Sequence, residues 1–175
     1  MSHIYSNSHV KLVSWLNRFC FSILTLTTLI IIPTSAAADD VPVATTKDYL
    51  AAWNEHDATK AANFLSEDVV YFDASVGKPI NGRVEAKKNV IEAFMNAVPD
   101  LKWESVGEPI VSNNTVVFEW TFSGTNTGDW SDGTKASNKK FSINGMSIFR
   151  FNNNKIIYQG DYYDALTFYT QLGLM

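Results

Sequence analysis

The sequence predicts an α+β domain in which one curved antiparallel sheet carries helices on its concave face. Helical periodicity dominates the first half of the chain after residue 44, and long segments of alternating polarity fill the second half. Helices and strands are therefore largely segregated, which is typical of the α+β class. Apolar residues make up 46% of the chain, so a disordered or collagen-like protein is excluded.

The first 38 residues have the layout of a secretory signal peptide. Lys11 and Arg18 precede an uncharged segment over residues 19–32, and a run of small residues ends at Ala38. The apolar segment is shorter than the about 20 residues that a membrane-spanning helix needs. We therefore expect cleavage after Ala38, a secreted or periplasmic location, and no stable membrane anchor in the mature protein. An uncleaved anchor is the alternative.

Cleavage after Ala38 changes the chemistry that the chain has to offer. The mature chain would have 137 residues with a net charge of −6, and Cys20, His3 and His9 would be removed. It would keep one histidine, His56, and no cysteine, which excludes disulfides, a thiol nucleophile and zinc sites built from Cys or several His. Its acidic charge argues against nucleic-acid binding. We expect neither a metal nor a cofactor.

The first half of the mature chain is predicted to hold three helices and one strand. Residues 39–46 are expected to form a flexible lead-in, with Thr45 as the cap of a first helix and Asp57 as the cap of a second helix through Leu65. Residues 69–73 are rich in β-formers, and the Gly and Pro residues of 74–82 indicate a loop. Apolar residues recur at helical spacing over 84–98.

The second half is predicted to be a meander of strands followed by one helix. Residues 101–111 form a broken strand, and 115–123 alternate apolar and polar side chains. Residues 141–151 and 155–163 form a hairpin, and Asp164 can cap a last helix over 165–172. The segment 129–133 between these strands is expected to be a solvated turn, in which Trp130 could cover the open end of the fold.

Four short motifs resemble a known family. They are Gly145-Met-Ser-Ile-Phe-Arg-Phe151, Lys155-Ile156, Asp161-Tyr-Tyr-Asp164 and Gln171-Leu-Gly173. The chain over residues 46–175 resembles the SnoaL-like polyketide cyclase (ester cyclase) family of the nuclear transport factor 2-like superfamily, which also holds ketosteroid isomerases and limonene epoxide hydrolases. The resemblance implies a cone, also described as a cystatin-like α+β barrel, whose sheet wraps a long helix and leaves an apolar pocket at its open end. It also implies a homodimer formed through the outer face of the sheet.

Asp161 is the strongest candidate catalytic residue. The resemblance implies a working Asp at this position of the last strand, where it would exchange a proton with the substrate during an intramolecular aldol closure. Strand alternation places Ile157, Gln159 and Tyr163 on its face. A buried acid there would need a partner. The alternative is a strand-end Asp bound to backbone N–H groups or to a Lys.

Asp73 and Tyr49 are further candidates. Asp57, Asp73 and Gly82 reproduce the spacing around the proton-abstracting Asp of the isomerases, and Tyr49 falls where those enzymes keep an oxyanion-stabilising Tyr. An apolar wall raises the pKa of a carboxylate toward the range useful for a general base, and a phenol can donate to an oxyanion. A loop-capping Asp and a half-buried Tyr are the alternatives.

The chain also departs from the ketosteroid isomerases and from the SnoaL-like cyclases at one position each. Ser147 stands where the isomerases carry a protonated Asp, and Asn126 stands where the cyclases usually have His. Ser147 shares a strand face with Gly145, and these small residues are expected to leave room for a ligand among the aromatic side chains.

Together these observations predict an exported, cofactor-free acid/base enzyme of the cyclase or isomerase type that acts on a small apolar carbonyl compound or ester. Asp161, Asp73 and Tyr49 are the candidate catalytic residues. The candidate pocket wall consists of Trp53, Tyr71, Phe118, Trp120, Ser147, Phe149 and Tyr163. The alternative is a non-catalytic module that binds a small molecule or a partner chain in the same cone, and the sequence leaves the choice open.

Overall fold

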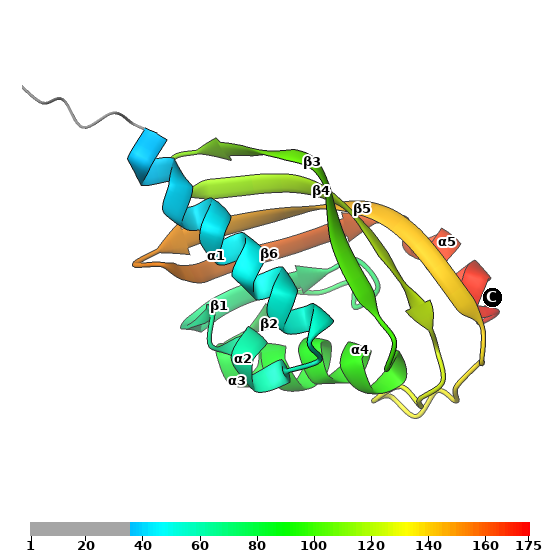
Figure 1. Ribbon diagram of the computed structural model, residues 1–175. Coiled ribbons are helices and arrows are strands. Elements are labelled where there is room, and N and C mark those ends of the chain that lie inside the picture. Colours follow the sequence, from blue (N-terminus) through cyan, green and yellow to red (C-terminus); the bar gives the residue numbers. More distant parts are fainter. Residues whose placement is uncertain (1–35) are drawn as a thin grey trace, which may run out of the picture. The chain divides into compact units, whose positions relative to one another are not determined.

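A computed structural model describes residues 36–175 (Figure 1). Residues 1–35, which hold most of the expected signal peptide and its Cys20, lie outside the described residues. Among the helices that the structure describes, none is long and apolar enough to cross a membrane.

The frame of the fold is a curved, unclosed sheet of six strands in the order β2-β1-β6-β5-β4-β3 (Figure 1). The strands are β1 (Leu65–Asp73), β2 (Ile80–Asn81), β3 (Lys102–Ser112), β4 (Thr115–Thr125), β5 (Lys140–Asn152) and β6 (Lys155–Tyr163). The predicted α+β class and the meander from β3 to β6 are confirmed. The expectation of a wholly antiparallel sheet is wrong at one place, because β1 and β6 pair in parallel. These two strands come from opposite ends of the domain, so no hairpin forces them to run in opposite directions.

The helices are α1 (Ala36–Asn54), α2 (Ala58–Ala62), α3 (Arg83–Ala86), the π-helical turn η1 (Lys87–Ile91), α4 (Glu92–Ala97) and α5 (Ala165–Leu172). Figure 1 shows α1 to α4 on the concave side of the sheet and α5 beside the first part of β5, where Gln171 bonds to the Ser142 backbone. The helix predicted over 84–98 is thus one continuous helical segment that contains a wider π turn, and its buried side includes Val90, Ile91 and Phe94.

Helix α1 begins earlier than predicted. Residues 39–46 are helical rather than a flexible lead-in, and Thr45 is not the cap. Its hydroxyl donates instead to the Val41 carbonyl at 2.9 Å, and the buried Thr46 hydroxyl donates to the Pro42 carbonyl at 2.8 Å. A threonine inside a helix commonly bonds to the carbonyl one turn back, so a Thr next to polar residues does not by itself mark a helix start.

The two aspartate caps are confirmed. The Asp57 carboxylate accepts from the Lys60 N–H at 2.8 Å, although α2 is shorter than predicted and Leu65 already belongs to β1. The Asp164 carboxylate accepts from the Thr167 N–H at 3.0 Å. Helix α5 then ends at Gly173, whose φ of 70° is the left-handed conformation that glycine adopts without strain.

The alternation predicted for β4 and β5 is confirmed, and that of β6 is partly wrong. The inward-facing apolar side chains of β4 are all buried: Val116, Phe118, Trp120 and Phe122. In β6 the register with β5 shifts between the pairs Arg150–Tyr158 and Phe151–Ile156. This bulge buries Ile156 and leaves Ile157 exposed, so Ile157 does not share the face of Asp161.

Candidate active site

Two buried carboxylates lie side by side on the concave face of the sheet. Asp73 is the last residue of β1, Asp161 lies near the end of β6, and the parallel register pairs them directly. Residues so paired on neighbouring strands point to the same face, with their backbones about 5 Å apart. Asp73 is 5% exposed and Asp161 is 4% exposed. The sequence predicted that both acids reach one pocket, and the structure brings them together there.

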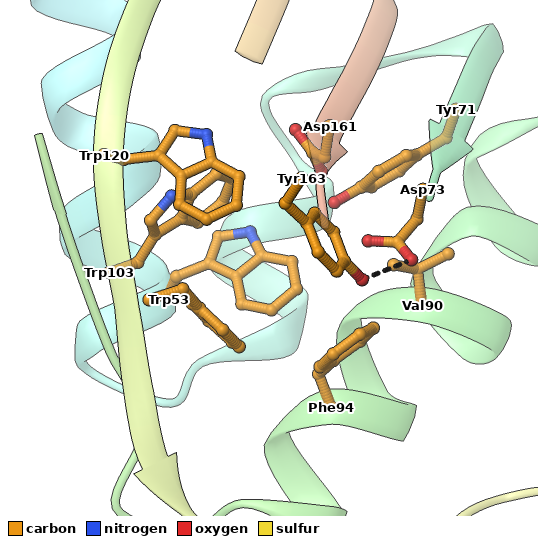
Figure 2. Close-up of a pocket in the computed structure, with 10 residues that line it drawn as sticks. Trp53, Tyr71, Asp73, Val90, Phe94, Trp103, Trp120, Asp161 and Tyr163 are labelled. Carbon is orange, nitrogen blue, oxygen red and sulfur yellow. Dashed lines mark hydrogen bonds between the residues drawn. The ribbon is translucent and has the colours of Figure 1, made fainter. Parts of the chain in front are cut away.

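Both acids line a small aromatic cavity of about 30 Å³. Figure 2 shows three tryptophans on one side of it, and the two acids with two tyrosines on the other. The lining residues are Trp53, Tyr71, Asp73, Val90, Phe94, Trp103, Trp120, Phe122, Asp161 and Tyr163. A cavity of this volume holds about one water-sized group. A larger ligand therefore has to displace aromatic side chains to enter.

Asp161 is bound through both of its oxygens. The Ser147 hydroxyl donates to Oδ1 at 2.6 Å, and the Gln159 amide donates from Nε2 to Oδ2 at 2.9 Å. Burial and the nearby charge of Asp73 raise the pKa of Asp161 to about 7, although the hydrogen bonds from Ser147, Gln159 and Tyr71 act in the opposite direction. The side chain can therefore take up or release a proton near neutral pH.

Asp73 is bound through one oxygen. Its Oδ1 accepts from the Ser75 N–H at 2.9 Å, the Ser75 hydroxyl at 2.6 Å, the Val76 N–H at 3.2 Å and the Tyr163 hydroxyl at 2.9 Å (Figure 2). Its Oδ2 makes no hydrogen bond to any residue that the structure describes. Burial raises the pKa of Asp73, and these four donors oppose that rise. The side chain caps the following turn and lines the cavity at the same time.

Ser147 positions Asp161 and does not line the cavity. Its hydroxyl accepts from Trp120 Nε1 at 2.8 Å, while it donates to Asp161. The Trp120 indole lies where a side chain on Gly145 would stand, since a Cβ atom there would collide with the ring. The expectation that Gly145 leaves room for a ligand is therefore wrong, because Trp120 fills that space.

Six of the ten candidate site residues line the cavity. They are Asp161, Asp73, Trp53, Tyr71, Trp120 and Tyr163. Phe118 and Phe149 pack against each other deeper in the core, with ring centroids 5.1 Å apart. The sequence missed Val90, Phe94, Trp103 and Phe122. Helical spacing marked Phe94 and strand alternation marked Phe122 as buried, but neither signal says which buried residues surround a cavity.

Tyr49 lies behind the cavity wall. Its ring packs edge to face against Trp53, Trp103 and Phe149, and its hydroxyl is buried without a hydrogen-bond partner among residues 36–175. Burial raises its pKa above the ordinary value for a tyrosine. The phenol on the cavity wall beside Asp161 is instead that of Tyr71.

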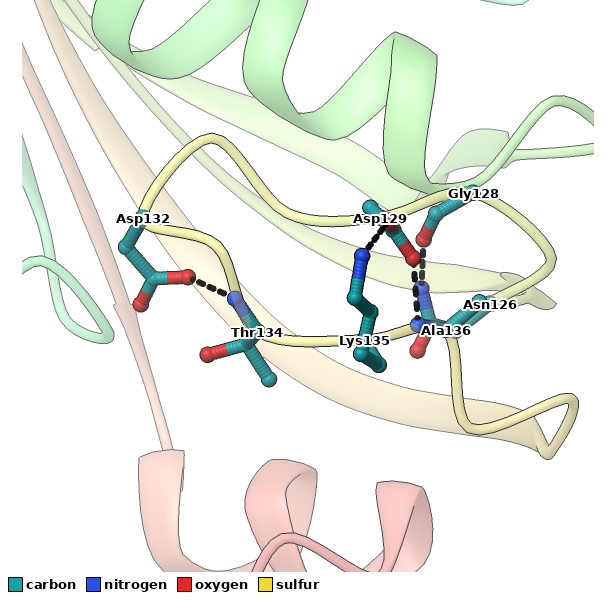
Figure 3. A network of polar contacts seen from close by, with 7 residues as sticks. All are labelled: Asn126, Gly128, Asp129, Asp132, Thr134, Lys135 and Ala136. Atoms are coloured by element: carbon teal, nitrogen blue, oxygen red, sulfur yellow. Dashed lines mark hydrogen bonds and ion pairs between the residues drawn. The ribbon is translucent and has the colours of Figure 1, made fainter.

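Asn126 organises the loop between β4 and β5, as Figure 3 shows in part. It is fully buried, and its Nδ2 donates to the Ala97 carbonyl at 3.0 Å and to the Gly128 carbonyl at 2.7 Å. Its Oδ1 accepts from the Ser137 N–H at 2.9 Å. The residue that stands in place of the cyclases' His thus holds the loop together and does not line the cavity.

The rest of this loop is tied by short polar contacts. The Asp129 carboxylate pairs with Lys135 at 2.7 Å, and Asp132 accepts from the Thr134 N–H at 2.9 Å (Figure 3). The expected solvated turn is confirmed. Trp130 packs edge to face against Phe94 at 5.4 Å, beside the cavity. No group of three or more His, Cys, Asp or Glu in the described part of the chain could hold a metal ion.

Comparisons with known proteins agree with this fold. The family model described as SnoaL-like polyketide cyclase matches residues 44–172. No curated protein sequence matches the chain.

Solved structures share the fold. TsrD from Streptomyces laurentii has a TM-score of 0.66 at 24% identity, covering 78% of this chain and 97% of its own. AclR from Streptomyces galilaeus has a TM-score of 0.65 at 21% identity, covering 78% and 87%. A Catenulispora acidiphila protein with a ketosteroid isomerase-like fold, solved in complex with trimethylamine, has a TM-score of 0.63 at 16% identity, covering 74% and 92%. At these identities the likeness shows the fold alone.

Proposed function

Because the chain belongs to the SnoaL-like polyketide cyclase family, we propose that it is a cofactor-free acid/base enzyme of the cyclase or isomerase type. Its substrate would be a small apolar carbonyl compound or ester. One observation carries this proposal: Asp73 and Asp161, paired in register, are buried together against an aromatic cavity. A buried pair of acids destabilises the fold, and perturbed carboxylates in a cleft are typical of active sites.

The two environments divide the work between the acids. Asp161 has a pKa near 7, so it is suited to remove a proton from the carbon next to the substrate carbonyl. Asp73 accepts four hydrogen bonds and is the better stabilised charge. Tyr71 can donate its hydroxyl hydrogen to the oxygen on which charge develops.

The chemistry then follows the fate of that proton. In a cyclase the enolate carbon would attack a second carbonyl of the same molecule, and Asp161 would return the proton to the new alkoxide. In an isomerase Asp161 would return it to a different carbon. Neither reaction changes the oxidation state of the substrate as a whole, and in both of them Asp161 returns the proton that it removes.

We also propose that the protein is exported by cleavage after Ala38 and forms a homodimer through the outer face of the sheet. Two partly exposed apolar side chains that are register partners on this face, Met146 and Tyr162, support the dimer. The basic, apolar and small-residue segments of the first 38 residues support export.

Hydrogen–deuterium exchange at carbon tests the proposed function without knowledge of the natural substrate. The mature protein is incubated in D2O with a panel of apolar ketones and β-keto esters, and deuterium uptake next to the carbonyl is followed by proton NMR. We expect Asp161→Asn to lower the rate at least about 100-fold, since positioned acid/base groups contribute on that order, and Asp73→Asn to lower it as well. The matched control is Asp164→Asn, which changes an exposed aspartate at a helix cap.

The alternative is a module that binds a small molecule or a partner chain without catalysis. Unchanged exchange in both Asp161→Asn and Asp73→Asn would contradict the acid/base mechanism. An apolar molecule retained by the wild type in native mass spectrometry, with no exchange on any compound of the panel, would establish the binding module instead.

A further inference from the structure

A buried glutamine connects Asp161 to the helix that covers it. Gln159 lies two residues before Asp161 on β6 and is fully buried. Its Nε2 donates to Asp161 Oδ2 at 2.9 Å, but its Oε1 has no hydrogen-bond partner among residues 36–175. A buried acceptor without a partner lowers the stability of the fold. A residue that keeps such a group beside a functional acid calls for a specific explanation.

Two unpaired donors lie on α1 beside this acceptor. The Tyr49 hydroxyl and Trp53 Nε1 are both buried and have no hydrogen-bond partner in the described part of the chain. The two residues are one helical turn apart, and their rings meet edge to face with centroids 6.3 Å apart. Gln159 is the register partner of Phe149, and the Tyr49 ring packs against Phe149 with centroids 5.6 Å apart. Burial raises the pKa of Tyr49, and the side chains of Trp53, Tyr71 and Gln159 act against that rise. The three unpaired groups are therefore neighbours.

The chemistry of these groups allows a continuous series of bonds that ends on Asp161. An indole N–H can only donate and a carboxylate can only accept, whereas a phenol and a carboxamide can do both. In this series Trp53 would donate to the Tyr49 oxygen, and the Tyr49 hydroxyl would donate to Gln159 Oε1, once small side-chain movements bring these groups within hydrogen-bond distance. Gln159 Nε2 donates to Asp161, as observed. Every bond in this series points toward Asp161.

We propose that Tyr49 and Gln159 are positioning residues that stabilise the charged form of Asp161 through this directed series of hydrogen bonds. Bonds that follow one another in the same direction strengthen each other in a medium of low dielectric. The proposal rests on the function proposed for Asp161, and it gives Tyr49 a different role from the direct oxyanion donor that the family resemblance implies. Tyr49 acts through Gln159, because its hydroxyl lies behind the cavity wall.

Other titratable groups also face Asp161. Asp73 and Tyr71 approach it from β1, Tyr163 from its own strand and Tyr49 from α1. Asp73 raises the pKa of Asp161. None of the ion pairs in the described part of the chain includes Asp161. Hydrogen-bond donors are thus the groups that oppose the rise in the pKa of Asp161.

A titration of the Asp161 carboxyl carbon by NMR tests the proposal in the full folded chain and needs no substrate. We expect Gln159→Leu to strengthen proton binding at Asp161 about tenfold, since it removes a bond to a charged group. Tyr49→Phe should strengthen it about threefold, since it removes one bond further along the series. In the double variant Tyr49→Phe should add nothing, because its effect passes through Gln159.

The matched control is Tyr158→Phe, which removes a phenol oxygen on the outer side of β6, where it bonds to Tyr162. It should leave the titration of Asp161 unchanged. A titration that is the same in Tyr49→Phe and wild type would overturn the proposal, as would an equal effect of Tyr49→Phe with and without Gln159. Should Gln159→Leu not fold, the mild change Tyr49→Phe decides alone. If no compound of the panel exchanges deuterium at carbon but the Asp161 titrations of the single and double variants behave as expected, the proposed function is rejected and this series of bonds is kept.

Discussion

At the scale of single residues, Asp161 is the clearest case of a side chain that weakens the fold. Its pKa is about 7 in the folded protein and about 4 in an unfolded chain. Between these two values the folded state binds more protons than the unfolded state, so the free energy of unfolding falls as pH rises through this range. Above pH 7 the full cost of the buried charge is present. An acid that destabilises its own protein at neutral pH fits a functional role better than a structural one.

Asp161→Asn should therefore stabilise the protein in a pH-dependent way. We expect the variant to exceed the wild type by roughly 2–4 kcal/mol in unfolding free energy at pH 8, because the buried charge is gone, and to show little gain at pH 4. Urea unfolding at both pH values measures this difference. An equal change at pH 4 and pH 8 would show that the pKa of Asp161 is not raised.

Asp164→Asn supplies the opposite control. Hydrogen bonds from Thr167 lower the pKa of the Asp164 carboxyl, which caps α5 at the surface. A lowered pKa stabilises the folded state above the unfolded value, and this contribution is lost as pH falls through the folded pKa. Asp164→Asn should therefore destabilise the protein at pH 8 and much less at pH 2.

At the scale of elements, one buried side chain links the loop between β4 and β5 to the end of α4. Asn126 donates to the carbonyl of Ala97 at the end of α4 and to that of Gly128 in the loop. It also accepts from the Ser137 N–H, so the loop and the end of α4 share this anchor. Trp130 extends from this loop onto Phe94 and Phe168 beside the cavity. The anchor therefore determines how firmly the aromatic cover of the cavity is held.

Asn126→Ala should loosen this cover. It leaves two carbonyls and one N–H without their buried partner, so we expect a loss of about 2–3 kcal/mol in unfolding free energy. Backbone hydrogen exchange should also quicken over residues 126–139 more than in the strands. The control is Asn96→Ala, an exposed asparagine on α4. Exchange in the loop that stays at the wild-type rate would show that Asn126 is not the anchor.

At the scale of the whole molecule, the start of α1 supports the proposed cleavage after Ala38. Pro42 lies inside the helix and lacks the N–H that an interior helix position uses. If the chain begins at Asp39, Pro42 falls in the first turn, where no N–H has an intrahelical partner.

Expression of the full chain in a secreting bacterium tests this proposal. We expect the exported product to begin at Asp39, and intact-mass spectrometry reads this directly. A protein that lacks Cys20 would also show no mass change with a thiol reagent. Retention of the full-length mass in the membrane fraction would support the uncleaved anchor instead.

The sequence by itself determined the fold class, the meander, two helix caps and the two acids of the site. These features rest on local signals: periodicity, Asp before a helix, and alternation along a strand, each of which acts within a few residues. Strand alternation placed Asp73 on the inward face and the family resemblance singled out Asp161, and the structure pairs the two.

Only the tertiary structure decided what surrounds those acids. The parallel pairing of β1 with β6 sets Asp73 beside Asp161, and no local pattern encodes which distant strands become neighbours. Because of the bulge in β6, Ile157 does not lie on the inner face. The Trp120 ring, not a ligand, occupies the space above Gly145. Tyr49, which was predicted to line the cavity, lies in the layer behind it. The cavity is the volume left after aromatic side chains from four strands and two helical segments have packed, so its size and lining emerge from packing across the whole domain.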